Sequence, residues 1–163
     1  MDLPSFSRVS LCARGTIHVA RGKPMNPTDN FRRQHGELGA IAKEIGDHLK
    51  RTSIAADSEA IRRLLVQLSG KLSVHKTMEE DALYPRLRVH PDPTVRLTAE
   101  RFLNDFGRAY SVYLAFARRW SAAGAIESDT DTFARDTAAV LSVLSERIVH
   151  ENNELYQMVD GLD

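Results

Sequence analysis

The sequence predicts an all-α fold, an antiparallel up-down four-helix bundle. Its 163 residues suit one domain, and a chain of this length buries roughly two thirds of the surface that it exposes when unfolded. Apolar residues recur every three or four positions through four long segments, and the alternation typical of β-strands does not occur. The links between the segments are short and polar, which favours antiparallel neighbours packed around one core.

Charge and composition argue against several classes of function. Lys and Arg number 22, as do Asp and Glu, and this balance predicts no broad basic surface for nucleic acid or acidic lipid. No apolar run is long enough for a membrane span, and the N-terminus lacks the pattern of a secretory signal. Cys12 is the single cysteine, so an intramolecular disulfide is impossible, and we expect a reducing, cytoplasmic setting.

The chain divides into an arm and a bundle. Residues 1–27 are predicted to form a flexible arm, because they mix proline, glycine, serine and basic residues without a sustained period. Residues 28–163 are predicted to form the bundle. The sequence leaves open whether translation starts at Met1 or Met25.

The first two predicted helices carry histidine within their apolar stripes. The first begins at the cap signal around Thr28, and its inward positions are Phe31, His35, Leu38, Ala42, Ile45 and Leu49. The second is expected to begin at Asp57 or Ser58, and its inward positions are Ile61, Leu65, Leu68, Leu72, His75, Glu79 and Leu83. Polar side chains are thus predicted to point into the core from both helices.

Two further helices complete the predicted bundle. Pro85 and the segment 91–93 are expected to separate the second helix from the third, whose stripe is Val95, Ala99, Phe102, Phe106, Tyr110, Tyr113, Ala117 and Trp120. Asp129 or Asp131 is expected to cap the fourth helix, whose buried side is Phe133, Val140, Leu144, Ile148, Leu155 and Met158.

His75 and Glu79 are the strongest candidates for chemistry. A step of four residues puts both side chains on one face of a helix, one turn apart, where an imidazole and a carboxylate can share a metal ion. An unpaired carboxylate in a core is costly, so Glu79 calls for a buried metal or a cationic partner. A hydrogen bond between the two side chains, or a hydrated salt bridge at the end of the bundle, would also explain the spacing.

Two segments carry a recognisable motif. His75-Lys-Thr-Met-Glu79-Glu80-Asp-Ala-Leu83-Tyr84-Pro85 resembles the HxxxEExxLFP segment of the second helix in hemerythrin-like (HHE cation-binding) domains. Glu151-Asn-Asn-Glu-Leu155-Tyr156 is similar to the EExxLF end of that family's fourth helix, and His35 matches its first-helix ligand position. The resemblance covers about residues 31–160. It implies a hemerythrin-like bundle that holds non-haem iron and that serves in O2 or NO binding and sensing, or in iron handling.

The third helix departs from the family pattern. The family's Glu-His step aligns with Asp105-Phe106, and phenylalanine cannot bind a metal. Tyr110, one turn later, aligns with a second histidine of oxygen-carrying members, and its phenolate would be a hard oxygen ligand for ferric iron. Tyr110 is otherwise a core tyrosine.

The fourth helix departs from the pattern as well, and its register has two readings. When Leu155-Tyr156 is aligned with the family's Leu-Phe, the ligand pair becomes Arg147 and Glu151. The alternative register supplies His150 and Glu154. Helical phase favours Glu151, which falls near the middle of the buried arc, whereas His150 falls at its edge.

The resemblance therefore implies metal ligands at His35, His75, Glu79 and Glu151, with His150, Glu154 and Tyr110 as additional candidates. Four ligands suit one metal better than an iron pair, and both a mononuclear and a di-iron site are kept open. Nitrogen and oxygen donors suit iron, manganese or zinc, so the choice of iron rests on the resemblance.

The alternative is a metal-free bundle that acts as an interaction or regulatory module, in which the same polar side chains pair with one another and with Arg147. A protein partner or a homodimer is compatible with either reading. Nucleophile-elbow motifs, phosphate-binding loops and paired Glu-x-x-His motifs do not occur in the sequence. The pattern thus favours a binding protein over an enzyme.

Overall fold

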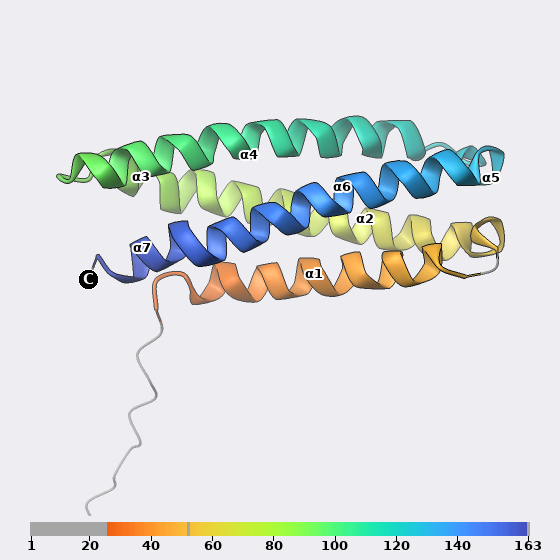
Figure 1. Ribbon diagram of the computed structural model, residues 1–163, viewed down its shortest axis with the longest axis horizontal. Helices are drawn as coiled ribbons and strands as arrows, with labels where there is room; N and C mark the ends of the chain where they lie inside the picture. The colour runs from red at the N-terminus through yellow and green to blue at the C-terminus, as the bar shows by residue number, and fades with distance from the viewer. Residues whose placement is uncertain (1–25, 52, 163) are drawn as a thin grey trace, which may run out of the picture.

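The computed structural model describes residues 26–51 and 53–162. Within these ranges the chain is helical and contains no strand, which confirms the predicted all-α bundle. Figure 1 shows long antiparallel rods, with the first and third at opposite edges of the view and the second and fourth between them. Residues 1–25, which include most of the predicted arm and Cys12, lie outside the described residues.

Each of the four rods corresponds to one predicted helix, and two of the rods contain a π-helical turn. In chain order the elements are α1 (Asp29–Leu49); α2 (Ile54–Met78), η1 (Glu79–Leu83) and α3 (Tyr84–Arg88); α4 (Pro93–Trp120); the short α5 (Ala125–Ser128); and α6 (Thr130–His150), η2 (Glu151–Leu155) and α7 (Tyr156–Asp160). No helix among these residues is long and apolar enough to cross a membrane.

The second rod begins earlier than the sequence predicts. Ser53 caps α2, and its hydroxyl accepts a hydrogen bond of 3.2 Å from the backbone N–H of Ala56. The two predicted caps have other partners: Asp57 contacts Nδ1 of His48 at 2.8 Å, and the Ser58 hydroxyl donates to Glu127 at 2.6 Å. Neither predicted residue therefore caps the helix, and Ser53, four residues before Asp57, does so instead.

Pro85 does not end the second rod, contrary to the prediction. The helix passes through η1 and continues as α3 to Arg88. Pro85 stands directly after η1, at the start of α3, where the change from π-helical to α-helical hydrogen bonding accommodates a residue without a backbone N–H. The predicted break occurs at Pro91 to Pro93, where the Asp92 carboxylate caps α4 by accepting from the N–H of Thr94 at 2.7 Å.

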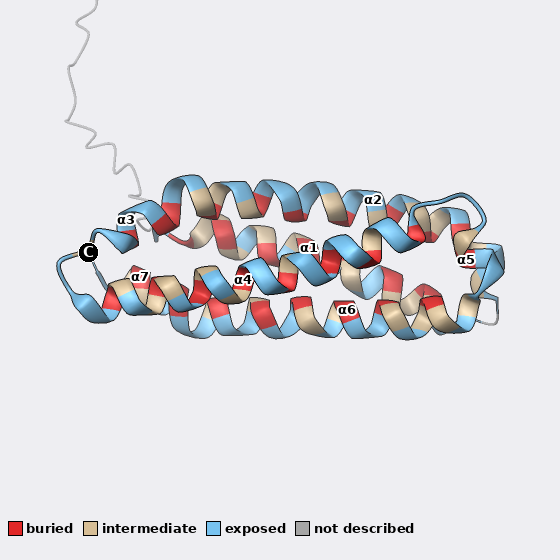
Figure 2. Ribbon diagram, turned by 90° about the horizontal axis from the view of Figure 1, so that it is seen from above, coloured by how far each residue is buried: buried red, intermediate tan, exposed pale blue. Residues whose placement is uncertain are grey.

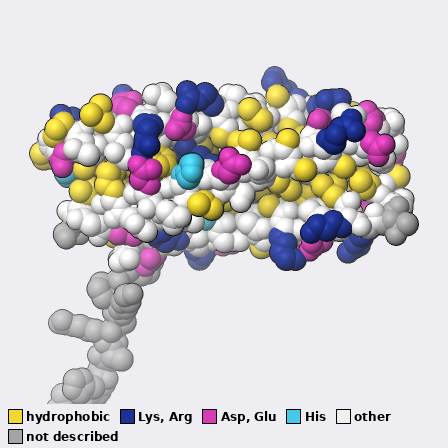
Figure 3. Space-filling view, viewed as in Figure 1, with side chains coloured by type: hydrophobic (Ala, Val, Ile, Leu, Met, Phe, Trp, Pro, Cys, Tyr) yellow, Lys and Arg dark blue, Asp and Glu magenta, His cyan; other side chains and the backbone are white. Residues whose placement is uncertain are grey.

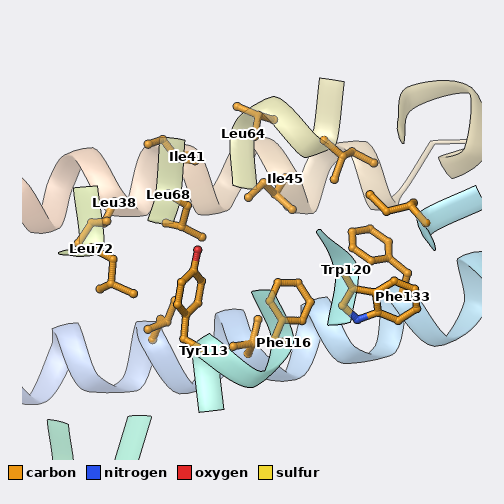
Figure 4. Packing of buried hydrophobic residues seen from close by; sticks show 14 residues of the cluster. Leu38, Ile41, Ile45, Leu64, Leu68, Leu72, Tyr113, Phe116, Trp120 and Phe133 are labelled. Atoms are coloured by element: carbon orange, nitrogen blue, oxygen red, sulfur yellow. The ribbon is translucent and has the colours of Figure 1, made fainter. Parts of the chain in front are cut away.

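In the part of the chain that the structure describes, the buried apolar side chains form two clusters. The larger cluster fills the middle and the α5 end of the bundle and includes Leu38, Leu72, Tyr113, Phe133 and Leu144 (Figure 4). The smaller one fills the end at which the chain terminates and includes Phe31, Leu83, Phe102, Leu155 and Tyr156. Buried residues follow the inner faces of the rods (Figure 2). Between the two clusters, the same faces carry polar side chains.

Side-chain hydrogen bonds connect the last helical turn of the bundle, at Asp160, to the start of α1. The Asp160 carboxylate accepts a hydrogen bond of 2.6 Å from the Thr28 hydroxyl and one of 2.9 Å from Nη2 of Arg32. Arg32 also donates to the backbone carbonyl of Asn152 at 2.8 Å. Burial alone would raise the pKa of Asp160, but the hydrogen bonds from Thr28 and Arg32 outweigh it and lower the pKa below its ordinary value.

We predict that Asp160→Asn lowers the free energy of unfolding by about 1–2 kcal/mol at pH 7, because a charge-assisted hydrogen bond is lost. A depressed carboxyl pKa stabilises the fold above the unfolded value of 3.8, and this stabilisation disappears as the pH falls through the folded pKa. Urea titrations at pH 7 and about pH 3 should therefore show the difference shrinking in acid. Asp105→Asn, which removes an exposed i,i+3 pair with Arg108, is the control and should change stability by less than about 0.5 kcal/mol. Equal stability of Asp160→Asn and wild type at pH 7 would contradict the assignment.

Candidate metal centre

Four ionisable side chains form a buried layer between the two apolar clusters. They are His35 on α1, His75 on α2, Glu79 at the start of η1 and Glu151 at the start of η2, and none is more than 3% exposed. Donor atoms of His35, His75 and Glu151 all lie within 4.8 Å of one another. The sequence placed all four on inward faces, and the structure brings them together.

The two π-helical turns begin at the two glutamates. A π turn holds one residue more than an α turn, so the helical phase shifts after it. Glu79 and Leu83 are buried and so is Tyr84, and the same holds for Glu151, Leu155 and Tyr156. The shift lets two consecutive residues, leucine and tyrosine, face the core after each glutamate.

The Nδ1 atom of each histidine ring forms a hydrogen bond with a side-chain amide. Nδ1 of His35 lies 3.0 Å from Oδ1 of Asn152, and Nδ1 of His75 lies 2.9 Å from Oε1 of Gln34. The Gln34 orientation is supported by its Nε2, which donates to the sulfur of Met78 at 3.0 Å. An amide oxygen only accepts, so each Nδ1 carries a hydrogen. In a neutral ring, Nε2 then bears a lone pair.

Those Nε2 atoms point at each other across 3.1 Å. Burial, followed by the nearby charge of His35, lowers the pKa of His75 to about 4, so this ring is neutral at pH 7. Two facing lone pairs repel unless a proton on one ring, or a cation, lies between them. The pattern of Nδ1–H bound to a carbonyl with Nε2 turned inward is the one that metal-ligating histidines adopt.

The two carboxyl groups of the layer differ in charge. Burial raises the pKa of Glu151, but the hydrogen bond with His35 and the charge of Arg147 outweigh burial and lower it, so Glu151 is ionised. Oε2 of Glu151 lies 3.2 Å from Nε2 of His35. Burial and the neighbouring Glu151 raise the pKa of Glu79 well above its ordinary value.

Glu79 has one satisfied and one unsatisfied oxygen. Its Oε1 accepts a hydrogen bond of 2.6 Å from the Tyr156 hydroxyl. Its Oε2 is buried without a hydrogen-bond partner and lies 3.7 Å from Nε2 of His75. A buried polar atom left unpaired costs roughly 1–3 kcal/mol, a cost that a metal ion bound in exchange for the carboxyl proton would remove.

A family model agrees with this geometry. The model of the hemerythrin HHE cation binding domain matches residues 26–159 of the chain. The chain belongs to the hemerythrin HHE cation-binding family. No curated protein and no solved structure matches it. The bundle is therefore a hemerythrin domain of a cation-binding family, and its buried His and Glu side chains form a candidate cation site.

Arg147 occupies the side of the layer that faces α4 of this hemerythrin domain. Its guanidinium donates to the carbonyl of Phe102 at 2.7 Å, to the Tyr84 hydroxyl at 3.1 Å and to Glu151. The charge lies 4.5 Å from the ring centre of Phe106. On this side α4 presents two phenylalanines, which supply no metal donor. The residues present thus fit one metal ion. A second ion would need ligands on the side toward α4, and the guanidinium of Arg147 occupies that side instead.

The three additional candidates are not brought to the layer. Tyr110 packs against Phe106 and Tyr113, with ring centres 5.9 and 6.5 Å away, and Lys76 lies over its ring. His150 is exposed, as is Glu154, which pairs with Arg101. The structure therefore turns Glu151 inward and places the alternative register of the fourth helix on the surface.

Four residues around the site were not singled out from the sequence: Gln34, Tyr84, Asn152 and Tyr156. Only the tyrosines left a signal. The family motif has Leu-Phe after each glutamate pair, and this chain has Leu-Tyr at both places. A hydroxyl at each position matches the observed bonds of Tyr84 to Arg147 and of Tyr156 to Glu79.

We predict that Arg147→Met destabilises the metal-free domain by about 3–5 kcal/mol at pH 7, because it leaves the buried Glu151 charge without its partner. Methionine keeps much of the aliphatic volume, so lost packing contributes little. Chemical denaturation in the presence of a chelator measures the change. Arg101→Met, which removes an exposed pair with Glu154, is the matched control and should cost less than about 1 kcal/mol. Similar losses in the two variants would show that the buried pair is not what stabilises this layer.

Proposed function

We propose that this hemerythrin domain binds one divalent metal ion, non-haem iron in the cell, through His35, His75, Glu79 and Glu151. The observation that carries the proposal is the pair of Nε2 atoms 3.1 Å apart, each on a ring whose Nδ1 is held by an amide oxygen. Two nitrogens this close need a proton or a cation between them, and a bound metal ion would take the place of that proton. It also satisfies the unpartnered oxygen of Glu79.

The spacing of the donor atoms supports a single ion. His35 to His75, His35 to Glu151 and His75 to Glu79 are separated by 3.1, 3.2 and 3.7 Å. Ligands about 2.0–2.2 Å from one cation lie roughly 3–3.5 Å from their neighbours, which is the same scale. Two imidazole nitrogens and two carboxylates form a borderline donor set that suits iron, manganese or zinc. Iron is preferred here because of the family.

The residues around the donors have distinct tasks. Asn152 and Gln34 fix the ring orientations of the two histidines through their Nδ1 hydrogens. The Tyr156 hydroxyl holds one oxygen of Glu79 and leaves the other free to bind. Burial and the neighbouring Glu151 raise the pKa of Glu79 and so favour its protonated form in the metal-free domain. A cation that binds there would displace this proton. A bound iron would supply an open position for a diatomic molecule.

We propose a role in sensing O2 or NO, or in iron handling, on the basis of family membership. The surroundings of the site support access by small apolar molecules, because Leu38, Leu72 and Phe106 lie beside the histidines in one cavity. The competing proposal is a metal-free interaction module. It is supported by the ion pair of Arg147 with Glu151, which already neutralises one carboxylate.

Metal titration tests the site. Protein stripped by a chelator should bind one Fe(II) or Zn(II) per chain, as measured by elemental analysis after desalting. Its melting temperature should rise, since a ligand at 100 times its Kd adds about 2.7 kcal/mol of stability. His75→Ala should lose the ion, whereas His150→Ala, which removes an exposed imidazole, should keep it. Two ions per chain would overturn the mononuclear site, and no bound ion with an unchanged melting temperature would leave the metal-free module.

The diatomic ligand is tested on the same samples. Anaerobic NO added to the Fe(II)-loaded protein should produce a new visible absorption band, and the Zn(II)-loaded protein should give none. An unchanged spectrum in the iron-loaded wild type would contradict a role in NO sensing without affecting the metal stoichiometry.

A further inference from the structure

A cavity of about 430 Å³ lies beside the metal centre and opens between α1 and α6. Its inner end is formed by His35, His75, Arg147 and Glu151. From there it follows α1 as far as Lys43, a little more than two turns of helix or about 12 Å. One water accounts for roughly 30 Å³ of liquid volume, so the cavity is far larger than a diatomic molecule requires.

Away from its inner end the cavity is lined mostly by apolar and small residues, with Lys43, Ser142 and Ser145 as the polar ones. Leu68 and Leu72 of α2, Leu144 and Ile148 of α6, and Phe106 of α4 form the walls. Gly39, Ala42 and Ala138 line the seam between α1 and α6. A Cβ atom placed at Gly39 would meet no atom within 4 Å, so the seam is open there. In Figure 3, hydrophobic side chains (yellow) are exposed on this face between α1 and α6.

The inner end of the cavity favours a negative charge. Arg147 is 8% exposed, and its Nε–H is buried without a hydrogen-bond partner. With a divalent ion bound, that ion and the guanidinium outweigh the two carboxylates of the layer by one formal positive charge. A monoanion with an acceptor oxygen complements this end of the cavity.

We propose that the cavity binds a small amphipathic carboxylic acid. The carboxylate lies at the inner end, toward the metal and Arg147, and an unbranched apolar chain lies between α1 and α6. Pockets of this size, with apolar walls and a few convergent polar groups, are typical binding sites for small molecules. The inference rests on the proposed metal site for part of the positive charge and adds a ligand class to it.

Octanoate is the probe for this site, and 1-octanol is its uncharged match. Calorimetric titration of the desalted Zn(II)-loaded protein should show one octanoate per chain, with octanol at least about tenfold weaker because it lacks the charge. Gly39→Leu should fill the cavity and weaken octanoate by more than about tenfold. Gly36→Leu is the control: Gly36 lies on the same helix, does not line the cavity and has equal room for a side chain.

Both substitutions replace glycine inside α1 and raise helix propensity equally, so a difference between them reports the cavity. No octanoate binding, equal binding of octanol, or equal binding by Gly39→Leu and wild type would each overturn the proposal. Zinc content is measured on the same samples. Protein that holds zinc but not octanoate contradicts only the ligand. Protein that holds no zinc, yet binds octanoate in a manner that depends on Gly39, contradicts the metal site and supports the cavity.

Discussion

The burial of charge in the middle of a helical bundle is the constraint on which the rest of this structure depends. Glu151 is ionised and almost fully enclosed, and an isolated carboxylate in such a place would cost many kcal/mol. Arg147, one turn earlier on the same rod, neutralises the charge of Glu151 through an ion pair. Its guanidinium also donates hydrogen bonds to the Tyr84 hydroxyl and to the backbone carbonyl of Phe102. The remaining polar groups of the layer can then be arranged for a single cation.

The sequence predicted the rods and the layer well, because both follow from helical phase. His35, His75, Glu79 and Glu151 each continue an apolar stripe at steps of three or four, so the inward direction of each was readable before any packing was known. The choice of Glu151 over His150 followed from the same rule. Phase also has limits: Leu64 is buried and Leu65 only partly so, because the neighbouring helices decide which side of the stripe is covered.

What the sequence could not reveal depends on distances between helices. The anchoring of His35 by Asn152 joins residues more than a hundred positions apart, and the bond between Asp160 and Thr28 joins the two ends of the domain. The sequence did not reveal the π-helical turns, because each one shifts the helical phase by a single residue. In a short segment, the apolar residues still recur at steps of three or four after such a shift. The cavity was missed because it arises from small side chains on two helices, and small residues carry little periodic signal.

Arg147 has a further consequence for how the domain would respond to metal. In a centre with two exchangeable ions, the first can alter the affinity for the second, and occupancy then rises with a threshold. In the proposed one-metal site, the second positive charge would be that of Arg147, which is covalently part of the chain and present at every metal concentration. Loading would follow a simple hyperbola, so the occupied fraction would report free metal in a graded way, with no switch-like step.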